Sequence, residues 1–150
     1  PKASPGEEEV QAGRVEALFG AQGSRRPISV VRRLQKLMWD RVGIVRTEEG
    51  LRQALTELDD IESESKDLQI RASGAYNTDV ADALELEMML QTARAMAMPA
   101  LERTESRGGH IRLDYPKLDD ANWLKNLVVW KEGGKLKLKS QAVEPREEKR

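Results

Sequence analysis

Apolar residues recur at intervals of three and four along three long segments of the chain, and this spacing predicts three amphipathic helices. The first helix covers residues 27–42, the second 47–70 and the third 79–102. Pro27 suits a first helical turn, and Thr47 is a good N-cap ahead of two glutamates. We therefore expect an all-α fold, a three-helix bundle with up-down-up topology.

Shorter elements are expected on both sides of this bundle. A short helix is predicted from residue 7 to Phe19, and alternating lysine and leucine near the C-terminus predict a small β-hairpin after a loop. The pattern divides the chain into a linker at 1–6, a helical domain at 7–130, and the second hairpin strand with a charged tail at 131–150.

Two features of the side chains refine the expected packing. We interpret the five methionines as filling of the bundle core, and Trp39, Trp123 and Trp130 as packing residues. Pro99 interrupts the pattern of the third helix, where it removes one backbone hydrogen bond at a cost of about 3 kcal/mol unless the helix bends or ends. We expect a bend there.

Composition excludes several classes of function. A length of 150 residues fits one domain, and 25 basic against 26 acidic residues give no field that would favour nucleic acid. The absence of cysteine excludes disulfides, thiolate zinc sites and cysteine-ligated clusters, and a single histidine, His110, argues against metal catalysis. No apolar run is long enough for a membrane span, so no direct membrane insertion is expected.

Charged residues gather between residues 103 and 120, on a backbone that Gly108 and Gly109 make permissive. Arginine forks bind anions, but such clusters also dock domains or pair among themselves, and we favour docking or internal pairing. A triad built on Ser106 and His110 lacks a nucleophile elbow. The basic members of the cluster are Arg103, Arg107, His110 and Arg112, and the acidic members are Glu105, Asp114, Asp119 and Asp120.

Several runs of this sequence resemble the C-terminal domain of succinate dehydrogenase and fumarate reductase flavoprotein subunits, which L-aspartate oxidase shares. The runs are Leu-Gln-Lys-Leu-Met-Trp-Asp-Arg-Val-Gly-Ile-Val-Arg at 34–46, Glu-Ser-Arg-Gly-Gly-His at 105–110, Asp-Tyr-Pro at 114–116 and Asp-Asp-Ala-Asn-Trp-Leu at 119–124. The resemblance covers about residues 27–130 and implies a three-helix bundle, in agreement with the helical periodicity.

The resemblance implies an oxidoreductase that passes a hydride between a C4 dicarboxylate and FAD, with electrons moving on to an iron–sulfur subunit. In that family the flavin and substrate residues lie upstream, and none of them maps onto this chain. The sequence also lacks the Gly-x-Gly-x-x-Gly turn of a dinucleotide site. We therefore expect no cofactor in this chain, FAD in the parent protein, and no activity of the chain alone.

The expected partners are the flavin-binding and capping domains of the same polypeptide, with the iron–sulfur subunit in the parent complex. The expected location is cytoplasmic, or peripheral at the inner face of the membrane through partner subunits. L-aspartate oxidase remains an alternative, as does a stand-alone helical protein-interaction module. The residues assigned to interdomain docking, with no catalytic role, are Arg103, Glu105, Arg107, His110 and Arg112.

Overall fold

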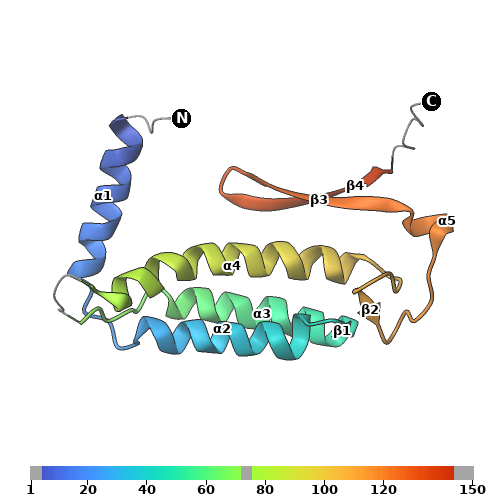
Figure 1. Ribbon diagram of the computed structural model, residues 1–150, viewed down its shortest axis with the longest axis horizontal. Coiled ribbons are helices and arrows are strands. Elements are labelled where there is room, and N and C mark those ends of the chain that lie inside the picture. Colours follow the sequence, from blue (N-terminus) through green and yellow to red (C-terminus); the bar gives the residue numbers. More distant parts are fainter. Residues whose placement is uncertain (1–4, 72–75, 144–150) are drawn as a thin grey trace. The chain divides into compact units, whose positions relative to one another are not determined.

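The computed structural model describes residues 5–71 and 76–143, and the expected mostly helical fold with a small β-hairpin is confirmed (Figure 1). The helices are α1 (Pro5–Phe19), α2 (Pro27–Val42), α3 (Glu48–Glu64), α4 (Thr78–Glu102) and α5 (Asp120–Trp123). The strands are β1 (Val45–Arg46), β2 (Ile111–Arg112), β3 (Lys125–Glu132) and β4 (Lys135–Ala142).

The chain forms two compact units, and each contains one part of α2, one part of α3 and one part of α4. The first unit comprises Pro1–Lys36 and Leu58–Gln91, and the second comprises Leu37–Glu57 and Thr92–Arg150. The parts of α2, α3 and α4 in each unit agree with the bundle that the periodicity predicts.

The core of the first unit consists of branched aliphatic side chains, together with Ala83. It contains Val30, Val31, Leu34, Leu58, Ile61, Leu68, Ile70, Val80, Ala83, Leu86 and Leu90. At its rim Arg33 of α2 forms an ion pair with Glu64 at the end of α3.

The second long helix, α3, ends at Glu64 and is therefore shorter than the helix predicted over 47–70. The following segment is extended and pairs with the loop before α2: Gly23 N donates to Leu68 O at 2.9 Å, and Gln69 N donates to Arg25 O at 2.8 Å. A Cβ at Gly23 would lie 2.3 Å from the backbone of Asp67, so this close approach requires glycine. Pairing between distant segments therefore replaces the last helical turns.

The core of the second unit is lined mainly by smaller side chains. Three alanines of α4, at 93, 97 and 100, are buried, whereas Met96 is 50% exposed. In the first unit, Met88 of the same helix is 62% exposed. The interpretation of the methionines as core filling is therefore wrong for these two. The helix α4 continues through Pro99 and ends at Glu102, and Arg103 N donates to Pro99 O at 3.0 Å. A bend at Pro99 stays a prediction.

The tryptophans differ in their surroundings. Trp39 on α2 is 84% exposed, so its interpretation as a packing residue is wrong. Trp123 is half-buried, and its Nε1 donates to Thr104 Oγ1 at 3.0 Å. Trp130 is 37% exposed on β3. Trp39 does not pack in the core because it lies on the outer face of α2, outside the apolar stripe of that helix.

The chain ends also differ from the predicted bounds. The helix α1 begins at Pro5, inside the predicted linker. The strand β3 ends at Glu132, beyond the predicted domain boundary at residue 130, and β4 continues to Ala142. The turn between them uses Gly133 and Gly134 at φ angles of 56° and 79°, as a type I′ turn requires. Residues 144–150, which hold most of the predicted charged tail, lie outside the described residues.

Candidate functional site

A two-stranded parallel ribbon holds the charged loop in the second unit. Val45 pairs with Ile111 and Arg46 pairs with Arg112, while Leu113 N donates to Arg46 O at 2.9 Å. Strands of two residues that are far apart in the chain leave no periodic signal, so sequence reasoning missed Arg46 as a site residue. The ribbon therefore brings a fourth arginine to the three predicted ones.

A tight turn connects the arginine-rich part of the loop to β2. Arg107 N donates to His110 O at 2.8 Å, and His110 N donates to Arg107 O at 2.9 Å. Gly108 occupies the first central position with φ of 56°, a conformation that favours glycine. The pair of glycines thus sets the direction in which Arg107 and His110 leave the turn.

Arg112 is fully buried and caps the C-terminal end of α4. Its Nη1 donates to three backbone carbonyls at 3.0 to 3.1 Å, those of Ala100, Leu101 and Arg103. A guanidinium is well suited to this position, because the last carbonyls of a helix lack partners and carry partial negative charge.

The other side of the same guanidinium grips Asp114. Arg112 Nε and Nη2 donate to the two carboxylate oxygens at 2.8 and 2.7 Å, a bidentate geometry. Asp114 also accepts from the backbone N of Glu48 at 2.8 Å, at the first residue of α3. These bonds hold the pKa of Asp114 down to about 2, with the Arg112 hydrogen bond as the largest cause. The pair links the end of α4 to the start of α3.

Glu105 is the second charged side chain with no exposed surface. It accepts from Arg107 Nε at 2.8 Å and Nη2 at 3.1 Å, from Arg103 Nη1 at 2.5 Å, and from Asp119 N at 2.8 Å. The Arg107 hydrogen bonds are the largest cause that lowers the pKa of Glu105, which falls to about 2 despite burial. Glu105 is therefore an ionised anchor and a poor proton donor.

The two arginines around Glu105 extend the network in different directions. Arg103 donates to the carbonyls of Trp123 at 3.0 Å and Lys125 at 2.6 Å, and its guanidinium lies 5.2 Å from the Trp123 ring centroid. Arg107 pairs with Asp120 at 2.5 Å, and its side chain is 33% exposed. Arg103 thus fixes the start of the hairpin, and Arg107 is a charged group that reaches the surface.

His110 is held between the guanidinium of Arg46 and the backbone carbonyl of Arg103. Its Nδ1 lies 2.6 Å from Nη1 of Arg46, which only donates, so we assign Nδ1 as the acceptor. Its Nε2 then faces the carbonyl of Arg103 at 3.3 Å. Burial is the largest cause that lowers the pKa of His110, and the charges of Arg46, Arg112 and Arg103 lower it further. The imidazole is therefore neutral at pH 7.

Ser106 belongs to the scaffold of the loop. Its Oγ accepts from Arg112 N at 2.9 Å and donates to Tyr115 O at 2.8 Å. In this arrangement the hydroxyl is not aimed at His110, whose ring nitrogens face Arg46 and Arg103. The geometry supports no nucleophilic triad.

The cavity that the structure describes beside the hairpin does not fit a flavin dinucleotide. This cavity of about 340 Å³ is lined by Glu102, Trp123, Lys125, Leu127, Leu138 and Lys139, together with Ser140. These residues include no glycine turn at a helix N-terminus, the feature that binds a pyrophosphate. Within residues 5–71 and 76–143, no group of three acidic or histidine side chains is placed to hold a metal ion.

Comparisons with known proteins identify the family. The model described as "Fumarate reductase flavoprotein C-term" matches residues 31–149. The chain belongs to this flavoprotein C-terminal family. It is 35% identical over 115 residues to the fumarate reductase flavoprotein subunit of Helicobacter pylori, covering 75% of this chain and 16% of that protein.

Two further relatives give the same assignment. The succinate dehydrogenase flavoprotein subunit of Coxiella burnetii is 34% identical over 108 residues, which are 71% of this chain and 18% of that protein. A chain of the Sdh1 complex of Mycobacterium smegmatis is similar over 100% of this chain and 26% of its own length, with a TM-score of 0.85 and 32% identity. The chain therefore spans about a fifth of the length of its relatives.

In the part of the chain that the structure describes, none of the helices combines the length and the apolar character of a membrane span.

Proposed function

We propose that this chain is the C-terminal helical domain of an FAD-dependent dicarboxylate oxidoreductase of the succinate dehydrogenase and fumarate reductase type, and that it docks against and supports the FAD-binding and capping domains. The family match and the names of the relatives support this proposal. In the parent protein, FAD would exchange a hydride with a C4 dicarboxylate, and an iron–sulfur subunit would receive electrons at the inner face of the membrane.

The observation that supports the docking role is that the side chains of the charged network are mostly buried and paired with one another. Arg112 and Glu105 are fully buried, and Arg103 is nearly so with 15% of its side chain exposed. Groups so thoroughly paired hold a loop in one shape and are poorly placed to bind substrate. Arg107, which is 33% exposed, and half-buried His110 remain as the members that reach the surface.

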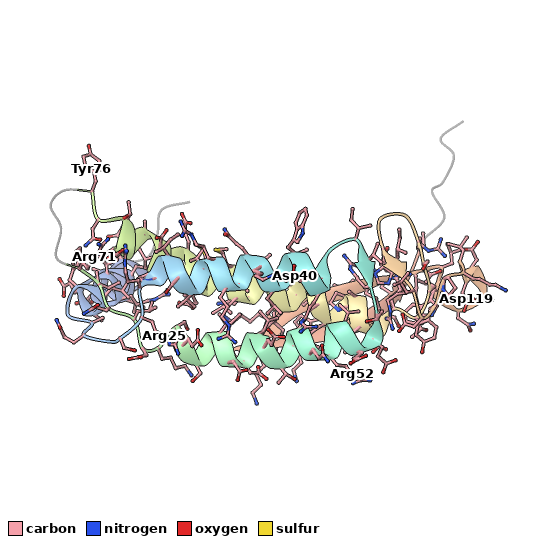
Figure 2. All side chains as sticks on the ribbon, turned by 90° about the horizontal axis from the view of Figure 1, so that it is seen from below. Arg25, Asp40, Arg52, Arg71, Tyr76 and Asp119 are labelled. Carbon is pink, nitrogen blue, oxygen red and sulfur yellow. The ribbon has the colours of Figure 1, made fainter. Side chains whose placement is uncertain are left out.

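The test is Arg107→Ala in the full-length polypeptide that carries this domain. The variant should lower the melting temperature and release FAD more readily, because Glu105 and Asp120 lose a partner. The rate of flavin reduction by succinate in a single turnover should stay unchanged in the protein that remains assembled. Arg52→Ala is the control, because Arg52 is 66% exposed on α3 and points into solvent (Figure 2).

Two outcomes would contradict the proposal. Unchanged stability with flavin reduction slowed about a thousandfold would show that Arg107 reaches the substrate. Stoichiometric FAD binding by the 150-residue chain alone would show that the chain is more than a supporting domain.

A further inference from the structure

The ribbon of β1 and β2 presents apolar side chains outward and charged side chains inward. Val45 and Ile111 face each other across the ribbon and are 52% and 38% exposed, and Leu113, two residues further, is 62% exposed. Arg46 and Arg112 alternate with them on the other face, where they bind backbone carbonyls. We call Val45, Ile111 and Leu113 the apolar strip.

This arrangement is the reverse of the usual one for a surface ribbon, in which polar side chains face water. Three large aliphatic side chains gathered on a few residues of backbone form a patch of the kind that marks an interaction site. Covering the exposed parts of these side chains removes apolar surface from water, which is favourable. A partner that covers the strip therefore gains stability that this chain cannot obtain by itself.

The backing of the strip is rigid. Behind Ile111 and Leu113, Arg112 binds Asp114, two carbonyls of α4 and the carbonyl of Arg103. Behind Val45, Arg46 Nε donates to Gly43 O at 2.5 Å. A surface held in one conformation before binding avoids the entropy cost of ordering it on contact. Half-buried Arg46 and buried Arg112 thus support the strip from behind.

We propose that the apolar strip is the contact surface for the part of the polypeptide that precedes this domain in its flavoprotein relatives. The inference rests on the proposed function and deepens it, because it moves the contact from the arginines to the aliphatic side chains in front of them. Two observations favour this occupant. The relatives are about four to six times longer than the matched region, and the matching model describes a C-terminal part. The strip also adjoins the turn of Arg107 and His110 along β2.

Cysteine labelling in the full-length polypeptide tests the proposal. This chain contains no cysteine, so Leu113→Cys and Met96→Cys each add one thiol to it at sites that are 62% and 50% exposed here. With any other cysteines of the polypeptide replaced, the thiol at position 113 should react with a maleimide at least about tenfold more slowly than the thiol at 96. Urea should remove this difference.

A second variant pair checks the energetic consequence. Leu113→Gln should lower the temperature of FAD release by about 3 °C or more, whereas Met96→Gln should change it by less than about 1 °C. Because both side chains are at least half exposed within this domain, a change in its own packing does not account for the difference.

The outcomes separate this inference from the proposed function. If the full-length polypeptide binds FAD but the thiols at 113 and 96 react equally fast, the strip is not the contact surface, and the proposed function stands. Protection at 113 that disappears on dilution would indicate a second copy of the chain as the occupant and would overturn the inference. If the full-length polypeptide binds no FAD, the proposed function itself fails.

Discussion

Each compact unit buries a carboxylate between two arginines, and the two sites differ in how far those arginines reach into water. In the first unit Asp79, 2% exposed, lies 3.0 Å from Arg71 and 3.4 Å from Arg26, whose side chains are 58% and 46% exposed. In the second unit the arginines around Glu105 are 15% and 33% exposed. Both carboxyl groups have a lowered pKa, and that of Glu105 falls to about 2.

The difference shows how one pairing can serve two purposes. The arginines at Asp79 are solvated, so these ion pairs stabilise the start of α4 while the guanidinium groups remain accessible to water. The arginines at Glu105 are shielded, and one of them also binds the backbone at Trp123 and Lys125. Losing the carboxylate should therefore be more costly in the second unit, because water replaces the lost ion pairs less readily at arginines that are 15% and 33% exposed.

The largest expected effect comes from neutralising each carboxylate in turn. Glu105→Gln should lower the free energy of unfolding by about 3 to 5 kcal/mol, because the largely buried Arg103 loses its ionised partner and Arg107 keeps only Asp120. Asp79→Asn should lower it by about 1 to 2 kcal/mol, because exposed arginines regain water. Urea unfolding followed by circular dichroism measures both, with Arg52→Ala as a surface control. Equal losses at the two sites would break the comparison.

A smaller effect is the contribution of His110 to the pH dependence of the free energy of unfolding. The folded-state pKa is lowered, so the neutral form is favoured on folding, and the stability from His110 is complete above the unfolded pKa near 6.5. That stability falls as the pH drops from about 6.5 towards the folded pKa. The chain has a single histidine, so one imidazole resonance in proton NMR should titrate with a midpoint below 6.5.

The reference for this titration is the chain in urea, where the midpoint should return to about 6.5. Arg46→Gln removes a neighbouring charge and should raise the folded midpoint relative to that of the unaltered chain. A folded midpoint at or above the urea value would show that the loop interior is not shielded, and it would undermine the contrast with Asp79.

The smallest effect is expected at Trp39. Replacement by Gln should change the free energy of unfolding by about 0.5 kcal/mol or less, because the side chain is 84% exposed. Trp123→Phe should cost more, since it leaves Thr104 without its donor and weakens the contact with Arg103. The same urea titration compares the two variants. A large loss of unfolding free energy in the Trp39 variant would mean that this side chain is packed and not exposed.

Much of the fold follows from local sequence patterns. Apolar spacing predicted α2 and α4 to within a residue or two, because an amphipathic stripe and its caps are encoded in adjacent residues. Alternating lysine and leucine predicted the hairpin for the same reason. The charged loop was also found from the sequence, since its arginines and glycines are close together in the chain. Local chemistry was sufficient for these features.

Features that depend on distant segments were decided only by the tertiary structure. Residues 67–69 leave the helical pattern because they pair with the loop around Gly23, and Arg46 joins the site because β1 pairs with β2. The sequence places Arg112 among exposed-looking charges, yet its side chain is fully buried because the carbonyls at the end of α4 and Asp114 satisfy it. Burial of a charge is set by partners that only folding brings within hydrogen-bond distance.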